Sequence, residues 1–400
     1  FFFYFPANHS PPSILAELLT AALGVNGMVW QSCPASTELE ETVMDWLRKL
    51  IGLPATFTGV IQDSASTATL CALLCAREQA TGHEFNRLGA TAVPAESSLR
   101  IYCSSQAHSS VTKGAKIAGF GADHVVPIDV DETFAMRPGE LDKRIRKDEA
   151  RGFKPCCVVA SIGTTSSTAI DPLRPIADCA ERHGLWLHVD GALAGAAGLL
   201  PEMRWMFEGL ERADSYVFNP HKWLMTNFDC SAFFTRHPDQ LIKTFAIDPE
   251  YLKTAQDHQA ANHRDWGLPL GRRFRALKLW FVLRSYGSEG LRQILRRHLD
   301  LARDFAAWVD ESESFFRMAP VPLQTICFRY HPAGFDHEQK LDNLNEELLS
   351  RVNGSGRVFL THTRLRDRYC LRMSIGQLST QARHVQEAWA LIVQTARDLS

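Results

Sequence analysis

The sequence predicts an α/β protein in which a mostly parallel sheet covered by helices fills the first two thirds of the chain, followed by a smaller α+β part. Three observations favour this fold class. Short apolar runs alternate with helical stretches up to about residue 285, a long amphipathic run and two further strands follow, and reactive side chains stand directly after several apolar runs. Covered parallel strands are nearly continuous apolar runs, and ligands bind at their carboxyl ends.

Apolar runs at 99–103, 157–160, 185–189, 216–218 and 232–234 are the expected strands of the large sheet. Helices are expected between them at 38–50, 65–78, 110–118 and 174–183. In the last third we expect helices at 274–283, 291–309 and 382–399 and strands at 324–330 and 369–374. The residues Gly287 to Gly290 should separate the first two of these helices. The polar stretch from Glu250 to Arg264 has no helical periodicity and predicts a mobile loop.

The length of 400 residues suggests two domains, because domains commonly contain roughly 100–200 residues. We expect a large domain over residues 1–285 and a small C-terminal domain over 286–400, with the boundary near Ser285. The chain begins with Phe1 rather than methionine. It is therefore expected to begin inside a longer natural chain.

The composition is that of an ordinary globular protein, with 45% hydrophobic and 22% charged residues. A net charge of -2 gives no reason to expect nucleic acid or an acidic membrane surface as a partner. Apolar stretches fall short of the ~18–20 residues that a membrane helix requires, so no membrane span is expected. The aromatic start at 1–5 lacks the basic flank and cleavage site of a signal peptide.

The ten cysteines are scattered, and most of them lie inside apolar runs. Their spacing suggests neither a zinc site nor a disulfide framework. We expect buried, reduced thiols in a cytoplasmic protein, and no metal ion.

Lys222 and Asp190 are the central pair of candidate residues. Lys222 follows the apolar run 215–218 and precedes Trp223, although lysine is strongly hydrated and usually faces solvent. Asp190 ends another apolar run. A lysine amine and a carboxylate at the ends of two buried strands are the groups that pyridoxal phosphate needs for its aldehyde and its ring nitrogen. Alternatively, Asp190 caps a helix and Lys222 points to solvent.

A phosphate group requires local donors in a chain without net positive charge. The stretch QDSASTAT at 62–69 precedes a helical run, so that hydroxyls and free backbone N–H groups meet at a helix N-terminus, where anions bind. An ordinary helix cap is the alternative. Asn219 and Thr165 are further candidates at strand ends, and the small Ala192 could lie beneath a ring.

Three histidines stand next to these candidates. His108 follows the strand at 99–103 and could lie flat over the cofactor ring or act as an acid near a substrate carboxylate. Histidines in such places are more often structural. His188 and His221 flank the strongest candidates, which favours supporting roles.

Five motifs together resemble the group II pyridoxal-phosphate decarboxylases, in particular the aromatic-L-amino-acid decarboxylases. They are GVIQDSAS at 59–66, AHSS at 107–110, WLHVD at 186–190, NPHKW at 219–223 and PLGRRFR at 269–275. The resemblance implies the fold-type-I architecture of aspartate aminotransferase, a large mostly parallel-sheet domain plus a smaller C-terminal domain. It also implies pyridoxal 5'-phosphate as cofactor and a homodimer with active sites at the subunit interface. The N-terminal helical segment of this family is missing before Phe1.

The resemblance also implies a role for each motif residue. Lys222 is the Schiff-base lysine, Asp190 contacts the pyridine nitrogen, and His108 stacks on the ring. The loop around Tyr251 matches the family's catalytic loop and makes Tyr251 the proton donor to the substrate carbon. The remaining cofactor contacts are Ala65, Ser66, Thr165, Ala192, Asn219 and His221.

Six positions are expected to bind the substrate by the same resemblance: Tyr4, Phe5, Pro6, Asn26, Met28 and Gly271. Asn26 and Met28 stand where animal relatives carry more apolar or aromatic pocket residues. A glycine at 271 matches a position that leaves room for an indole. It could equally be a turn glycine before a helix.

The implied activity is decarboxylation of an aromatic L-amino acid to its amine and CO2. One alternative is an aromatic aldehyde synthase, which releases aldehyde, ammonia and peroxide and carries phenylalanine in place of the loop tyrosine. Tyr251 and His108 favour simple decarboxylation. A cofactor-binding relative without activity is the alternative from a different class.

Overall fold

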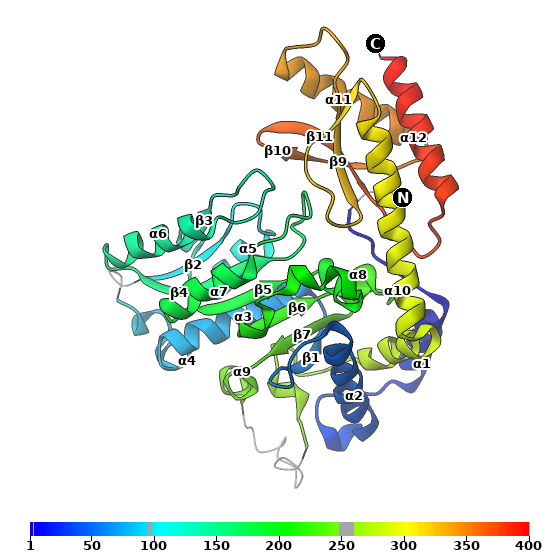
Figure 1. Cartoon of the computed structure of the whole chain (residues 1–400). Helices are drawn as coiled ribbons and strands as arrows, with labels where there is room; N and C mark the ends of the chain where they lie inside the picture. The colour runs from blue at the N-terminus through cyan, green and yellow to red at the C-terminus, as the bar shows by residue number, and fades with distance from the viewer. Residues whose placement is uncertain (3, 95–97, 248–259, 400) are drawn as a thin grey trace.

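The computed structural model describes residues 1–2, 4–94, 98–247 and 260–399, and its strands form two separate sheets. Figure 1 shows the seven-stranded sheet between layers of helices and the four-stranded sheet beside the C-terminal helices. The predicted α/β class with a large, mostly parallel sheet and a smaller C-terminal α+β part is confirmed.

The strands are β1 (Thr58–Gln62), β2 (Leu99–Ser104), β3 (Val125–Ile128), β4 (Lys154–Ser161), β5 (Trp186–Asp190), β6 (Ser215–Phe218), β7 (Ser231–Thr235), β8 (Phe315–Arg317), β9 (Thr325–Tyr330), β10 (Thr361–Leu365) and β11 (Arg368–Ser374). The α-helices are α1 (Pro11–Leu23), α2 (Pro34–Ile51), α3 (Ala65–Ala80), α4 (Glu84–Leu88), α5 (Ser110–Ile117), α6 (Pro138–Glu149), α7 (Leu173–Arg182), α8 (Pro220–Trp223), α9 (Pro238–Phe245), α10 (Arg275–Asp310), α11 (Glu338–Gly354) and α12 (Ala382–Arg397). Short 3-10 helices are η1 (Trp30–Ser32), η2 (Gly89–Ala92), η4 (Ala122–His124), η5 (Ala194–Leu199), η6 (Pro201–Phe207), η7 (Leu210–Arg212) and η9 (His263–Asp265).

The large sheet has the strand order β1-β7-β6-β5-β4-β2-β3. Neighbours from β6 to β3 are parallel, whereas β7 runs antiparallel to both β6 and β1. The carboxyl ends of β2, β4, β5 and β6 therefore meet at one edge of the sheet. The sequence predicts ligand-binding groups at this edge.

Helices cover both faces of this sheet, and alternate residues of β4 show it. Val158 and Ala160 join the core that contains α2, α6 and α7, while Cys157 and Val159 join the core that contains α3 and α5. Strands buried on both faces become continuous apolar runs, and for this reason the sequence marked β2, β4, β5, β6 and β7 clearly.

Helix α10 connects the two sheets: it runs from the side of α1 to the four-stranded sheet (Figure 1). The two helices expected on either side of residues 287–290 meet inside α10, where Gly287 alone departs from helical geometry, with φ 62° and ψ 175°. A conformation with positive φ favours glycine. The separating segment is thus a kink rather than a loop. The proposed domain boundary near Ser285 falls two residues before this kink.

The four-stranded sheet has the order β10-β11-β9-β8, and all its neighbouring strands are antiparallel. The mobile loop expected at 250–264 lies largely outside the described residues. For its end the expectation is wrong: His263 begins η9, and both His263 and Arg264 are buried. The Arg264 backbone N–H donates to the Met28 carbonyl at 2.9 Å, which fixes this end to residues near α2.

The cysteines agree with the prediction of reduced thiols. All ten are free, nine of them are buried, and Cys33 is half-buried. Within the described ranges, no helix combines the length and the apolar composition that crossing a membrane requires.

Candidate active site

A cavity of about 250 Å³ lies at the carboxyl edge of the large sheet. It brings together residues that follow β2, β4, β5 and β6, the first turn of α3, and Phe5 from the start of the chain. The lining residues are Phe5, Ser64, Ala65, Ser66, His108, Ser161, Gly163, Thr164, Thr165, Asp190, Ala192, Asn219, His221, Lys222 and Phe228. All the proposed cofactor-binding residues are among them.

Lys222 lies in α8, directly after β6, and its ammonium group reaches into this cavity. Burial lowers the pKa of Lys222 below its usual value; the Asp190 carboxylate opposes this effect and the Arg372 guanidinium adds to it. A less basic amine is more often unprotonated and can attack a carbonyl carbon. The Lys222 Nζ atom lies over the Phe5 ring, 5.2 Å from its centroid.

Asp190 is the last residue of β5 and is buried. Its Oδ1 atom accepts a hydrogen bond of 2.9 Å from the Ala192 backbone N–H, which fixes the carboxylate at the strand end. The Asp190 side chain lines the cavity. A buried carboxylate next to a cavity can hold a protonated ring nitrogen.

The first turn of α3 supplies backbone donors for an anion. Ser64 caps this helix, and its Oγ accepts from the Thr67 N–H at 3.2 Å. Ala65 and Ser66 begin the helix and line the cavity, so unpaired N–H groups of a 16-residue helix point toward it. Asn219 also lines the cavity, and its Oδ1 accepts from Ser231 Oγ at 2.7 Å, so that its amide group is held in place.

His108 follows β2 and lines the cavity. Its Nδ1 atom accepts a 3.1 Å hydrogen bond from the Ser110 N–H, so a neutral ring carries its proton on Nε2. Burial lowers the pKa of His108, which keeps the ring neutral. A neutral imidazole that lines the cavity suits both stacking on a ring and donating to a carboxylate.

The two other histidines are also neutral. Burial lowers the pKa of His221 to about 4, and its Nδ1 accepts from the Cys230 N–H at 2.9 Å. Burial also lowers the pKa of His188 to about 4, and its ring lies between the Ser215 hydroxyl (2.9 Å) and the Thr69 hydroxyl (3.3 Å). His188 therefore connects β5 to β6 and α3 beneath the cavity, whereas His221 lines it.

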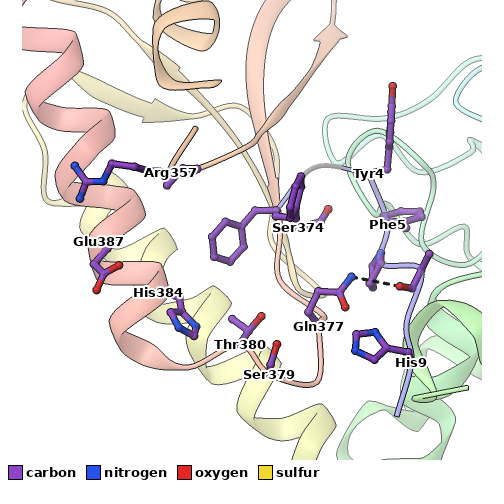
Figure 2. A pocket seen from close by; sticks show the side chains of 15 residues that line it. Tyr4, Phe5, His9, Arg357, Ser374, Gln377, Ser379, Thr380, His384 and Glu387 are labelled. Atoms are coloured by element: carbon purple, nitrogen blue, oxygen red, sulfur yellow. Dashed lines mark hydrogen bonds between the residues drawn. The ribbon is translucent and has the colours of Figure 1, made fainter. Parts of the chain in front are cut away.

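The candidate substrate residues lie in three places. Phe5 lines the Lys222 cavity, whereas Tyr4 and Pro6 line an adjacent cavity of about 820 Å³ between the chain start and α12. Figure 2 shows this second cavity, with His384 and Glu387 of α12 on one side and Tyr4, Phe5 and His9 of the chain start on the other.

Asn26, Met28 and Gly271 form a separate group that does not reach the Lys222 cavity of the same chain. Asn26 Oδ1 accepts from the Arg272 N–H at 2.8 Å, and Gly271 lines a cavity of about 170 Å³. Met28 belongs to the same region through its hydrogen bond to Arg264. Tyr251 lies outside the described residues.

Arg372 is a site residue that the sequence reasoning missed. It lies on β11, is buried, and its guanidinium carbon is 4.6 Å from the centroid of the Phe5 ring. Its Nε donates to the Ser166 carbonyl at 3.1 Å, but its Nη2 has no hydrogen-bond partner among the described residues. An arginine inside an apolar strand was the available sign, since arginine is almost never fully buried unless paired.

This set of residues fits pyridoxal phosphate. A less basic lysine, a fixed carboxylate, helix N–H donors and a neutral imidazole surround one cavity, and the small Ala192 leaves room beneath a flat ring. The fold and the cavity together define a pyridoxal-phosphate enzyme.

Comparison with known proteins identifies the family. Residues 1–331 match the pyridoxal-dependent decarboxylase conserved domain. The chain is 41% identical to phenylacetaldehyde synthase of Arabidopsis thaliana, over 99% of this chain and 81% of that protein. It is also 41% identical to aromatic-L-amino-acid decarboxylase of Sus scrofa, over 100% and 82%.

A solved structure agrees: Oryza sativa TDC with pyridoxal phosphate and tryptamine has a TM-score of 0.95 and 35% identity, over 100% of this chain and 83% of that chain. The chain belongs to the pyridoxal-dependent decarboxylase family, and its fold is the expected fold type I. Pyridoxal phosphate is its cofactor.

Proposed function

We propose that this chain decarboxylates an aromatic L-amino acid to the corresponding amine and CO2. The observation that carries the proposal is the placement of Lys222 and Asp190 in one cavity of a chain that belongs to a decarboxylase family. Relatives named for aromatic substrates, at about 40% identity, support the substrate class.

In this proposal each residue has a defined task. Lys222 holds the cofactor through its amine, the first turn of α3 holds the phosphate, and Asp190 keeps a proton on the ring nitrogen. When bound, pyridoxal phosphate supplies a ring that accepts the electron pair left when the Cα–carboxylate bond breaks. Tyr251 then delivers a proton to Cα.

Phe5 prepares the cavity in the proposed reaction. Its ring lies between Lys222 Nζ and the buried Arg372 guanidinium, so that it covers the cavity and keeps water away from Lys222. A panel of aromatic amino acids, assayed for CO2 and for amine, tests the proposal and ranks the substrates. Gly271 favours an indole side chain, so tryptophan is expected among the best. Absence of amine from every aromatic substrate would contradict the proposal.

The second candidate function is oxidative decarboxylation to an aldehyde, which the 41% identity to a phenylacetaldehyde synthase supports. Tyr251 distinguishes the two. We expect the wild-type enzyme to release amine and no peroxide, and Tyr251→Phe to release aldehyde and peroxide, because the proton donor is gone and oxygen reacts instead. The measurement is peroxide formed per CO2. Stoichiometric peroxide from the wild type would reverse the assignment.

We also propose that the enzyme is a homodimer. Helix α1 supports this, because it buries its small and polar side chains and exposes its large apolar ones, the inverse of an ordinary surface helix. Ser13, Ala16 and Thr20 are buried. Its larger apolar side chains Ile14, Leu15, Leu18, Leu19 and Leu23 are 44–63% exposed. A contiguous apolar surface of this kind marks an interaction site. The second copy is the proposed occupant, and it would bring Asn26 and Met28, which follow α1, and Gly271, which lies against Asn26, near the partner's cavity.

Charged substitutions on α1 test the dimer. We expect Leu15→Glu with Leu18→Glu to weaken association at least about 100-fold, because burial of each leucine contributes roughly 1.5–3 kcal/mol. Sedimentation over a range of concentrations measures the effect, and activity should fall with the dimer. Ile117→Glu is the matched control, since Ile117 on α5 is 65% exposed. A monomeric wild type with full activity would contradict the proposal.

A cytoplasmic location is proposed as well. Ten free thiols and no disulfide among them suit a reducing compartment. Microscopy of the tagged full-length protein tests this.

A further inference from the structure

The start of the chain contributes Phe5 to the Lys222 cavity and is fixed on both sides. Ser10 Oγ donates to the Met225 carbonyl at 2.7 Å, just after α8. On the other side Gln377 Nε2 donates to the Ala7 carbonyl at 3.4 Å, as Figure 2 shows. The segment therefore lies between the turn that carries Lys222 and the residues that follow β11.

Asn8 joins these two parts with a single buried side chain. Its Nδ2 donates to the carbonyl of Lys222 at 3.1 Å and to the carbonyl of Gly376 at 2.5 Å. Its Oδ1 accepts from the Leu378 N–H at 3.3 Å, and its own backbone N–H donates to the His221 carbonyl at 2.9 Å. Both amide protons and the amide oxygen are thus used, and the side chain is only 2% exposed. A fully satisfied buried amide fixes the groups that it joins.

Gly376 packs closely against Pro6 at the start of the chain. A Cβ atom added at Gly376 would lie 2.6 Å from Cγ of Pro6. Because Pro6 follows Phe5 directly, any displacement here would move the ring that covers Lys222. The backbone of Gly376 is therefore held against the start of the chain by packing as well as by Asn8.

We propose that Asn8 is a positioning residue for Lys222, which it holds in register with Phe5 and Arg372. Asn8 acts through the Lys222 carbonyl on one side and through Gly376, four residues after Arg372, on the other. Phe5 precedes Asn8 by three residues, and its ring contacts both basic groups, Lys222 Nζ at 5.2 Å and the Arg372 guanidinium at 4.6 Å. Asn8 thus sets the relative position of two basic groups, one that follows β6 of the large sheet and one on β11 of the small sheet. The inference rests on the proposed function.

A second link should keep the fold intact when Asn8 is changed. Trp223 Nε1 donates to His298 Nδ1 at 3.0 Å, and His298 Nε2 lies 3.1 Å from the Gln377 carbonyl. The residue after Lys222 therefore remains tied to the segment after β11 through α10. Loss of Asn8 should loosen the Lys222 position without separating the two parts.

The test compares Asn8→Ala with a matched control, Asn345→Ala. Asn345 is equally buried, and its amide makes three backbone hydrogen bonds of 2.8 Å far from the cavity. For Asn8→Ala we expect kcat to fall on the order of 10- to 100-fold with little change in KM, since small misplacements near the reacting groups have effects of this size. The cofactor-free variant should also react with added pyridoxal phosphate more slowly than the wild type does. The pH midpoint at which the absorbance of the lysine-linked cofactor changes should differ from that of the wild type. Asn345→Ala should lower Tm and change none of these.

The outcomes separate the two proposals. If the wild type forms no lysine-linked cofactor, the proposed function is wrong. If the wild type forms it and Asn8→Ala matches the wild type in rate of cofactor attachment, titration midpoint and kcat, the positioning role is wrong. Should Asn8→Ala fail to fold, Asn8→Ser replaces it, because the serine hydroxyl can keep one of the two donated hydrogen bonds. An intermediate change is then expected, and wild-type behaviour would overturn the inference.

Discussion

Replacement of Lys222 with alanine is expected to abolish both decarboxylation and the absorbance of the lysine-linked cofactor. Among the described residues that line the cavity, Lys222 is the lysine, so the other side chains in that set cannot form this bond. Spectra after addition of pyridoxal phosphate measure the loss. Borohydride reduction of the wild type, followed by peptide mass analysis, should place the cofactor on the peptide that contains Lys222.

The stability of the cofactor-free variant distinguishes this result from misfolding. Burial lowers the pKa of Lys222 from its usual 10.5, so the unfolded chain binds more protons than the folded chain between the two values. The wild type should therefore gain stability as the pH rises through this window, and Lys222→Ala should lack this gain. Lys143→Ala, at an exposed lysine, is the control and should keep the absorbance. If Lys222→Ala retained the absorbance band of the lysine-linked cofactor, Lys222 would not be the residue that binds it.

Asp190→Asn is expected to lower kcat on the order of 100- to 1000-fold, the size of effect seen when one preorganised electrostatic partner is removed. The asparagine oxygen can still accept from the Ala192 N–H, so the strand end keeps its shape. It cannot hold a proton on the ring nitrogen by charge. The measurement is kcat in cofactor-saturated enzyme, with the lysine-linked absorbance retained.

Asp148→Asn is the matched control for this change, because Asp148 is also a buried carboxylate but hydrogen-bonds to Tyr102 and Arg144 away from the cavity. We expect it to lower stability and to leave kcat of the folded enzyme near the wild-type value. Equal kcat for Asp190→Asn and the wild type would show that the carboxylate has no part in the reaction.

The sequence predicted the parts of the fold that carry a local pattern. Strands covered on both faces are apolar runs, and helix α3 is marked by its serine cap, so both were found. Helix α1 was missed, and which side of it faces outward could not be read from its sequence. The kink in α10 was read as a separating segment because glycine marks both.

The same limit applies to the candidate site. Lys222 and Asp190 stand directly after strands, where a reader of sequence looks for ligand groups. Arg372 had a weaker sign, its place inside an apolar strand, and Asn8 had none, since the contacts of Asn8 with Lys222 and Gly376 join residues 214 and 368 positions apart. Only the folded chain brings them together. The grouping of Asn26 with Gly271, away from Lys222, was equally invisible in the sequence.

The inverted helix α1 has a consequence for how much enzyme a cell can maintain. If the chain pairs as proposed, a subunit without its partner presents five leucine and isoleucine side chains to water, and such surfaces are bound by chaperones and proteases. By mass action, pairing at low abundance depends on the square of the subunit concentration. Halving synthesis should then remove more than half of the catalytic capacity.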